Sequence, residues 1–394
     1  MNGTTFTVGF DGLFLDQTAT GVGMYASNLW RIFDSSDSLS SPIRLLVPDV
    51  PSNEDFSGSS VTRLAPPSMF QSSKAVKLWW EQWGMLQAAR AGAADLVHIP
   101  HFAAPIRSDR PVIVTIHDVI PYVYPAYRAS ASMRLYLRLI SRATRNAAAI
   151  ITDSECSRRD IERYLGIDRK KITVIPLAAD EQFRPSHDIE ADAELRDRFD
   201  LPGPVIFNVG GLDVRKNVEA LVRAFAAAVS DIDPATRLVI SGSAHSGNTR
   251  LYPPLEPLIA ELGLQDRIVL TGRISEADKL RLYNLADLYV FTSLYEGFGL
   301  SPLEAMACGT PVICSNRSSL PEVVGEGGIL VDPTPQKIAG AISTVMNDGY
   351  LRRRLSASGL EQAASFSWEK TAAMTRAVYE RVYAGDNESV TTSS

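Results

Sequence analysis

The segment LYVFTSLYEGFGLSPLE, residues 288–304, joins a short apolar run to a glycine-rich turn and a helix signal. Apolar residues in the run do not alternate with polar ones, which is typical of a strand buried on both faces of a parallel sheet. Gly297 and Gly299 then let the backbone approach a ligand closely. Ser301 and Glu304 have the spacing of an N-cap and its capping box, so we expect a helix to begin at Ser301.

The same unit of a short apolar run followed by a helical pattern recurs along both halves of the chain. Expected strands lie at residues 6–10, 43–47, 96–99, 112–116, 149–152 and 174–175, and again at 205–209, 237–241, 268–271, 288–293, 311–314 and 328–331. Helical patterns include residues 218–229, 276–285 and 336–346. Strands that alternate with helices predict an α/β fold with two Rossmann-like, doubly wound domains.

Domain boundaries follow from the proline-rich, charged stretch near residues 180–204. We expect an N-terminal Rossmann-like domain at residues 1–185 and a second one at 186–366, with a cleft between them. An amphipathic helix at 367–384 ends the ordered chain, and the polar residues 385–394 are expected to fray. The length of 394 residues suits two domains, each large enough for its own core.

Composition and charge exclude several classes of protein. The net charge is −6, with 39 Lys and Arg against 45 Asp and Glu, so a nucleic-acid-binding protein is disfavoured. Three cysteines do not suit a disulfide framework, which favours a reducing compartment. Since no secretory signal and no apolar run of membrane-spanning length are found, we expect a cytoplasmic protein.

A second glycine turn, residues 208–217 (NVGGLDVRKN), follows the first strand of the second half. Arg215 and Lys216 stand there at the carboxyl end of a strand, where open α/β sheets bind ligands. A helix start and two fixed cations suit a diphosphate, while Glu296 and Glu304 suit sugar hydroxyls. The two turns therefore predict a nucleotide-sugar site with no metal.

These motifs carry a resemblance to a known family. The two glutamates of residues 296–304, the continuation AMACGTPVI at 305–313 and LPEVV at 320–324 resemble the signature of family 4 retaining glycosyltransferases of the GT-B fold. In the first half, GVG at 21–23, TIHDVIP at 115–121 and TDS at 152–154 stand in the order that the family shows. The resemblance covers nearly the whole chain.

The resemblance implies a role for each matching residue. Glu296 would contact the donor hexose and Glu304 the ribose, while Arg215 and Lys216 would stabilise the departing diphosphate. His117 would lie by the sugar near the acceptor, so the implied catalytic set is His117, Arg215, Lys216 and Glu296. The remaining implied donor contacts are glycines and the start of the helix: Gly21, Gly23, Gly211, Gly297, Phe298, Gly299, Leu300 and Ser301.

One departure affects this assignment. Many family members have an arginine directly after the first glycine of the second domain's loop, whereas this chain has Gly211 there. We assign that role to Arg215. The resemblance favours a GDP-sugar, with mannose as the hexose, over a UDP-sugar. The acceptor stays open between a glycan or lipid-linked glycan of a surface polysaccharide, a soluble sugar and a secondary metabolite.

Other classes of protein stay open on sequence alone. A GT-B nucleotide-sugar epimerase would form product without an acceptor, and a non-catalytic sugar-nucleotide binding protein would bind without turnover. Residues 21–26 match a loose dinucleotide fingerprint, but the preceding strand ends too early for a NAD dehydrogenase.

A basic helix pattern suggests a further partner. Arg134, Arg138 and Arg142 recur at a spacing of four residues with no acidic residue between Asp118 and Asp153. Such a helix face either contacts the inner surface of a membrane or is simply solvated.

Overall fold

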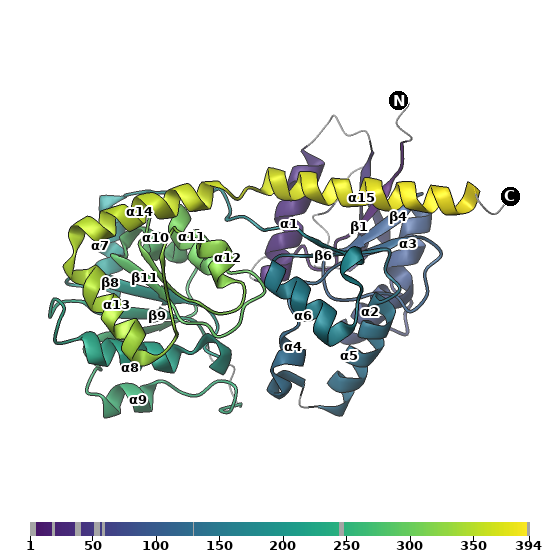
Figure 1. Cartoon of the computed structure of the whole chain (residues 1–394). Coiled ribbons are helices and arrows are strands. Elements are labelled where there is room, and N and C mark those ends of the chain that lie inside the picture. The colour runs from purple at the N-terminus through teal and green to yellow at the C-terminus, as the bar shows by residue number, and fades with distance from the viewer. Residues whose placement is uncertain are drawn as a thin grey trace. The chain divides into compact units, whose positions relative to one another are not determined.

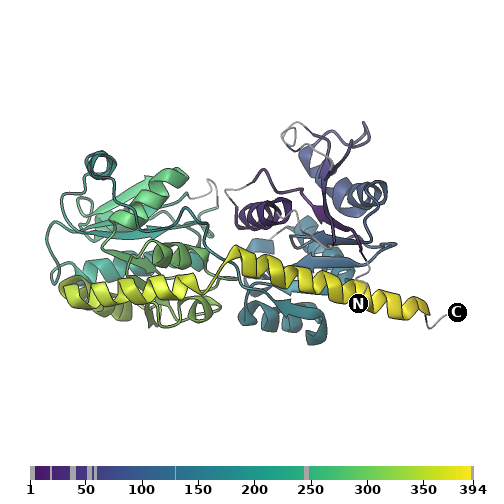
Figure 2. The ribbon, with the colours of Figure 1, turned by 90° about the horizontal axis from the view of Figure 1, so that it is seen from above.

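The computed structural model describes residues 5–17, 20–35, 41–50, 56, 60–128, 130–243 and 248–391, with the side chains of 386–391 left out. It divides into two compact units (Figures 1 and 2). The first comprises Met1–Leu177 and Trp368–Ser394, and the second comprises Ala178–Ser367. Each unit holds one parallel sheet covered by helices, which confirms the predicted α/β fold class.

The first unit is built on a seven-stranded parallel sheet in the order β3-β2-β1-β4-β5-β6-β7. Its strands are β1 Val8–Asp11, β2 Ile43–Pro48, β3 Val61–Leu64, β4 Leu96–Ile99, β5 Val112–Thr115, β6 Ala149–Thr152 and β7 Ile172–Val174. Its helices are α1 Gly21–Asp34, α2 Ser73–Trp79, the π-helical η2 Trp80–Gly84, α3 Met85–Ala91, α4 Ile120–Val123, η3 Pro125–Arg128, α5 Ala131–Thr144, α6 Glu155–Leu165, η4 Arg169–Lys171 and α15 Trp368–Thr391.

Side-chain alternation along these strands assigns the two faces of the sheet. Val97, Val114 and Ile150 join a core that α2, α3, α5 and α6 cover. The intervening residues point to the other face, where Phe10 packs edge-on against Phe33 of α1. Strands buried on both faces explain the apolar, non-alternating runs in the sequence.

The second unit is built on a six-stranded parallel sheet in the order β10-β9-β8-β11-β12-β13. Its strands are β8 Val205–Val209, β9 Arg237–Ser241, β10 Ile268–Gly272, β11 Leu288–Phe291, β12 Val312–Ser315 and β13 Ile329–Val331. Its helices are α7 Ile189–Arg198, η5 Val214–Lys216, α8 Val218–Ala228, α9 Glu256–Glu261, α10 Glu276–Leu285, α11 Leu300–Ala307, α12 Leu320–Val324, α13 Pro335–Asn347 and α14 Gly349–Ala364.

Strand order places a topological switch point in this sheet. Chain order reverses between β8 and β11, which pair directly through Leu288 and Ile206. Open α/β sheets bind ligands outside the carboxyl ends of the strands at such a point. The two glycine turns of the sequence follow these two strands, so the fold brings them to the same edge.

Two boundaries differ from the sequence prediction. The division falls after Leu177 rather than after residue 185, because Phe183 packs against Tyr283 with ring centroids 5.9 Å apart and the Ser186 N–H donates to Asn284 Oδ1 at 2.7 Å. The last helix continues to Thr391, beyond its predicted end at residue 384, and residues 392–394 lie outside the described part.

The C-terminal helix α15 is anchored in the first unit by a buried histidine. Figures 1 and 2 show α15 lying along that unit beside α1. His98 of β4 hydrogen-bonds the Tyr379 hydroxyl of α15 through Nδ1 and the Thr115 hydroxyl through Nε2, both at 2.7 Å. Burial lowers the pKa of His98 to about 3, so the ring is neutral at pH 7 and holds both hydroxyls without a charge.

Replacing Tyr379 with Phe tests this anchor. The variant leaves a ring nitrogen of fully buried His98 without its partner, so we expect Tyr379→Phe to lower the free energy of unfolding by about 1–3 kcal/mol. Urea denaturation measures the change, with exposed Tyr350→Phe as the matched control. Equal stability of the two variants would contradict the anchoring role.

Candidate active site

The candidate site of the second unit is formed by three loops at the carboxyl edge of its sheet. They follow β8, β11 and β12, which are adjacent strands. Each loop contributes groups that the others bind, so the site is a single hydrogen-bonded assembly rather than three separate turns.

A carboxylate and two cations form the centre of this assembly. Lys216 Nζ lies 2.6 Å from Glu296 Oε1, and Arg215 Nη1 lies 2.9 Å from Glu296 Oε2. Arg215 Nη1 also donates to the Tyr295 carbonyl at 2.8 Å. The fold thus brings together three of the four residues predicted as catalytic, and they come from loops about 80 residues apart in sequence.

Local turn chemistry presents the two cations. The Asp213 carboxylate accepts the Arg215 N–H at 3.2 Å and starts the short helix η5. Asn217 then takes a left-handed conformation with φ of 55°, and its amide donates to the Pro333 carbonyl at 2.9 Å. Thr292 Oγ1 donates to the Lys216 carbonyl at 3.0 Å, which ties this turn to the end of β11.

The pKa of Glu296 reflects its neighbours. Burial alone raises the pKa of this carboxyl, but attraction to Lys216 and Arg215 outweighs burial and holds the pKa below its ordinary value. Glu296 is therefore ionised at pH 7. Its single charge is shared between the two cations that the sequence assigned to a diphosphate, and Asp213 Oδ1 adds a second negative charge 3.4 Å from Arg215 Nε.

The helix after this loop does not begin where the sequence predicts. Helix α11 starts at Leu300 with Gly299 as its N-cap, so the predicted capping box of Ser301 and Glu304 is wrong. Gly299 has a φ of 134°, and a Cβ atom there would lie 2.9 Å from Leu320 Cδ2. A glycine is needed at this turn, and once Gly299 starts the helix, Glu304 is too far along to cap it.

The anion site predicted at the start of this helix stays a prediction. The first N–H groups of α11 lack partners within the helix and lie at the carboxyl edge of the sheet. Phe298 is buried and packs edge-on against Phe366, with ring centroids 5.9 Å apart. The loop of Gly297, Phe298 and Gly299 thus has a fixed hydrophobic anchor. Ser301 is the second residue of α11.

Glu304 lies in a separate buried cluster on the same helix. Its carboxylate accepts hydrogen bonds from the Tyr283 hydroxyl at 2.9 Å and from Lys279 Nζ at 3.2 Å. Burial raises the pKa of Glu304, and Lys279 with Tyr283 offsets part of that rise. Lys279 and Tyr283 were not predicted as partners of Glu304, although their spacing of four residues on a predicted helix puts them on one face.

A pair of serines after β12 holds the glycine loop and was also missed. The Ser318 hydroxyl accepts the Glu296 N–H at 2.7 Å and donates to the Glu296 carbonyl at 3.0 Å. Ser319 Oγ donates to the same carbonyl at 2.9 Å. These bonds span 22 and 23 residues, so local sequence patterns gave no signal for them.

The first unit places His117 at the carboxyl end of β5. Its Nδ1 lies 2.7 Å from Asp153 Oδ2, and its Nε2 lies 3.3 Å from the Pro100 carbonyl. Burial lowers the pKa of His117, but the charge of Asp153 outweighs burial and raises the pKa above its ordinary value. Both neighbours accept hydrogen bonds, so this arrangement favours a protonated ring that donates over a neutral ring that takes a proton.

Gly21 and Gly23 begin helix α1 of the same unit. Thr20 caps the helix by accepting the Gly23 N–H at 3.1 Å. A Cβ atom at Gly23 would lie 2.1 Å from the Gln17 carbonyl oxygen, so only glycine fits there, whereas a Cβ atom at Gly21 would meet open space. Gly211 of the second unit lies beside Asp213, with its Cβ position 3.0 Å from Oδ2. The roles of these three glycines at a donor stay predictions.

Arg134, Arg138 and Arg142 are all exposed on α5 of the first unit. Among the described residues, no helix is both long and apolar enough to cross a bilayer. Nor does this part of the chain bring three or more His, Cys, Asp or Glu together in an arrangement suited to a metal ion.

Comparison with known proteins relates the chain to sugar-transferring enzymes. Residues 193–362 match the family model described as glycosyl transferases group 1, and residues 42–183 match glycosyltransferase family 4. The chain is 29% identical over 343 residues to the O-antigen chain mannosyltransferase B of Escherichia coli, covering 85% of this chain and 87% of that protein.

Two further relatives are also described as mannosyltransferases. The MMP alpha-(1->4)-mannosyltransferase of Mycolicibacterium hassiacum is 31% identical over 312 residues, with 76% of this chain and 68% of the relative covered. The serotype-specific mannosyltransferase WbdA of Escherichia coli is 31% identical over 293 residues, which is 71% of this chain and 36% of that protein. The chain thus spans about a third of WbdA.

A solved structure supports the fold alone. The sucrose-phosphate synthase of Thermosynechococcus elongatus superposes with a TM-score of 0.72 at 22% identity, covering 96% of this chain and 100% of that one.

Two substitutions separate the effect of losing the Ser318 hydroxyl, which holds the Glu296 backbone, from the effect of relieving the backbone strain at this residue. Ser318 has a φ of 51°, which costs an L-residue about 1 kcal/mol and costs glycine almost nothing. Both Ser318→Ala and Ser318→Gly lose the hydroxyl, but only Gly relieves the backbone. We expect Ser318→Ala to be the less stable by about 1 kcal/mol in urea unfolding. Equal or reversed stabilities would contradict the described backbone at Ser318.

Proposed function

The chain belongs to glycosyltransferase family 4 and is a hexosyltransferase of GT-B fold; from this premise we propose that it transfers mannose, with retention at the anomeric carbon, from GDP-mannose to a glycan hydroxyl. The observation that carries the proposal is the contact of Glu296 with both Arg215 and Lys216 at the switch point of the second sheet. A carboxylate and two cations at this edge match the needs of a sugar and a diphosphate.

We propose that donor binding exchanges the partners of the two cations. In the structure, Glu296 pairs with both Lys216 and Arg215. A bound diphosphate would take over these cations, and the freed carboxylate would then accept hydrogen bonds from hexose hydroxyls. The N–H groups at the start of α11 would add to the binding of the phosphates.

The proposed chemistry stabilises the leaving group. The bond between the anomeric carbon and the phosphate oxygen breaks, and a bond to the acceptor oxygen forms on the same face of the sugar. Negative charge then develops on the departing diphosphate, where Arg215 and Lys216 reduce its cost. The departing phosphate oxygen takes the acceptor proton, so no side chain is needed as the base.

His117 has a different proposed role. Because both of its ring nitrogens face acceptors, we propose that the ring is protonated and that its Nε2–H exchanges the long 3.3 Å contact with the Pro100 carbonyl for a hydrogen bond to a sugar hydroxyl, while Nδ1–H stays on Asp153. Asp153 would position the ring and keep it charged.

The proposed sugar and acceptor rest on the relatives. Three of them are named as mannosyltransferases, and one of these names refers to an O-antigen chain. A glycan or lipid-linked glycan of a surface polysaccharide is therefore the proposed acceptor. Contact of Arg134, Arg138 and Arg142 with a membrane stays a prediction.

Calorimetric titration with GDP, UDP, ADP and NAD, without added metal, tests the proposed donor class. We expect GDP to bind most tightly, followed by release of GDP from GDP-mannose when methyl α-mannoside is the acceptor. Preference for UDP would overturn the proposed base, and product formed from the donor without any acceptor would favour an epimerase.

Replacing Lys216 with Ala tests the proposed leaving-group role. We expect Lys216→Ala to lower turnover of the donor more than tenfold, since typical losses on removing one such transition-state contact are about 100-fold or more. Lys337→Ala removes an exposed lysine from α13 of the same unit and serves as the control. Near-normal turnover of Lys216→Ala would refute this placement.

A further inference from the structure

A cavity lies in the first unit, at the opposite edge of the sheet from His117. Its volume is about 580 Å³. Val112 and Ala148 lie at the amino ends of β5 and β6, and Lys171 directly precedes β7, so these lining residues mark the amino edge of the sheet. A ligand held there would not take part in the sugar chemistry. The cavity therefore needs an explanation other than substrate turnover.

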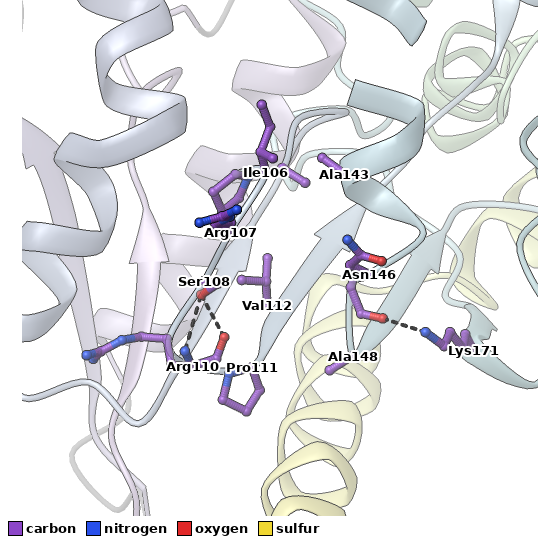
Figure 3. A pocket seen from close by; sticks show the side chains of 13 residues that line it. Ile106, Arg107, Ser108, Arg110, Pro111, Val112, Ala143, Asn146, Ala148 and Lys171 are labelled. Carbon is purple, nitrogen blue, oxygen red and sulfur yellow. Dashed lines mark hydrogen bonds between the residues drawn. The ribbon is translucent and has the colours of Figure 1, made fainter. Parts of the chain in front are cut away.

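The walls of this cavity carry positive charge and hydrogen-bond donors. Figure 3 shows Arg107 on one wall and Asn146 with Lys171 on the other. Lys171 Nζ donates to the Arg145 and Ala147 carbonyls at 3.2 and 3.1 Å, which fixes the ammonium and leaves a third N–H for a ligand. None of the 13 described lining residues is acidic.

The acidic residue nearest in sequence is already paired, so Arg107 can bind an anionic ligand. Asp109, the acid of the same loop, lies 2.8 Å from Arg90 Nε and 3.2 Å from Arg110 Nη2, so its charge is already paired. The Arg110 guanidinium turns from the cavity toward Asp109 and the Ala94 carbonyl. Within the described part of the chain, Arg107 has no ion pair or hydrogen bond. Arg107 is thus the cation that an anionic ligand would meet first.

An apolar surface adjoins these cations. Ile106 and Arg107 also line a neighbouring cavity of about 400 Å³ together with Trp83 and Leu86. Trp83 and Ile106 are 57% and 56% exposed. The Gln82 amide donates a hydrogen bond to the Ala104 carbonyl at 3.2 Å and accepts one from the Ile106 N–H at 3.1 Å. These bonds hold the loop that carries Ile106 on the π-helical turn η2.

Helix α5 extends the same surface. Leu135 and Leu139 are 58% and 46% exposed, and they lie two turns and one turn before Ala143, which lines the first cavity. Arg138 and Arg142 are exposed on the same helix. The Tyr136 hydroxyl of α5 donates a hydrogen bond to the Glu81 carboxylate of η2 at 3.2 Å, which keeps this helix beside the turn that carries Trp83. Exposed apolar and basic side chains therefore share one region of the first unit.

We propose that this region docks on a bilayer, with the phosphate of an anionic phospholipid bound in the cavity between Arg107 and Lys171. The phosphate would accept hydrogen bonds from Arg107, Lys171 and the Asn146 amide. Trp83, Ile106 and Leu139 would enter the interfacial layer, where amphipathic aromatic rings are favoured. A small soluble anion would explain the cations but not the exposed apolar side chains beside them.

Vesicle flotation of the full chain tests the docking surface. We expect binding to vesicles of phosphatidylcholine mixed with phosphatidylglycerol and little binding to phosphatidylcholine alone. Each cation near an anionic surface contributes roughly fivefold in affinity, so Arg107→Gln with Lys171→Gln should weaken binding by roughly tenfold or more. The control, Arg353→Gln with Arg354→Gln, removes the same charge from exposed positions on α14 of the second unit.

Two further measurements keep the result decisive. Arg107→Gln alone, at an exposed and unpartnered residue, should still weaken vesicle binding about fivefold if Lys171→Gln disturbs folding. Bromine-labelled lipid should quench the fluorescence of the wild type, and Trp83→Phe should lose most of that quenching.

Equal weakening by the pocket and control variants, no vesicle binding, or binding of inorganic phosphate alone would overturn the proposal. Donor titration of the same variants should be unchanged, so failure here is separate from failure of the proposed sugar transfer.

Discussion

The contact of Glu296 with Lys216 and Arg215 is the interaction on which the site depends. It joins the loop after β8 to the loop after β11 across the switch point, with nitrogen–oxygen distances of 2.6 and 2.9 Å. All three side chains are largely shielded from solvent, so removal of one would leave an uncompensated charge in a poorly hydrated place. In the proposed function, this carboxylate occupies the two cations until a diphosphate takes them over.

The fold explains why these groups meet. Parallel strands end at one edge, and every loop that follows them can contribute a side chain or a backbone group there. In the second unit this edge holds Glu296, the two cations and the first turn of α11. In the first unit it holds His117 and Asp153, which follow β5 and β6. Two sheets of similar topology thus present different chemistry at corresponding edges.

Sequence alone predicted the buried strands and the residues directly after them. Strands such as β4 and β8 have the predicted limits because both of their faces are buried and most of their side chains are apolar. Strand β3 was missed, since it lies at the sheet edge, is only half-buried and contains Arg63. The start of α11 was misplaced because serine at a capping spacing is a weaker determinant than a glycine with positive φ.

Contacts distant in sequence account for the rest. Ser318 clamps Glu296 from another loop, and Lys279 with Tyr283 binds Glu304 from another helix. No local pattern encodes these pairings, because they exist only once the strands have assembled. The sequence therefore predicts which residues carry the chemistry, and the tertiary structure determines which groups orient and neutralise them.

Calorimetric titration of Glu296→Gln with GDP tests the central claim most directly. If Glu296 competes with a diphosphate for Lys216 and Arg215, the variant should bind GDP more tightly than the wild type while it loses transfer from GDP-mannose. Weaker binding of GDP by a folded Glu296→Gln would contradict the account, because it would mean that the carboxylate supports the diphosphate site instead of occupying it.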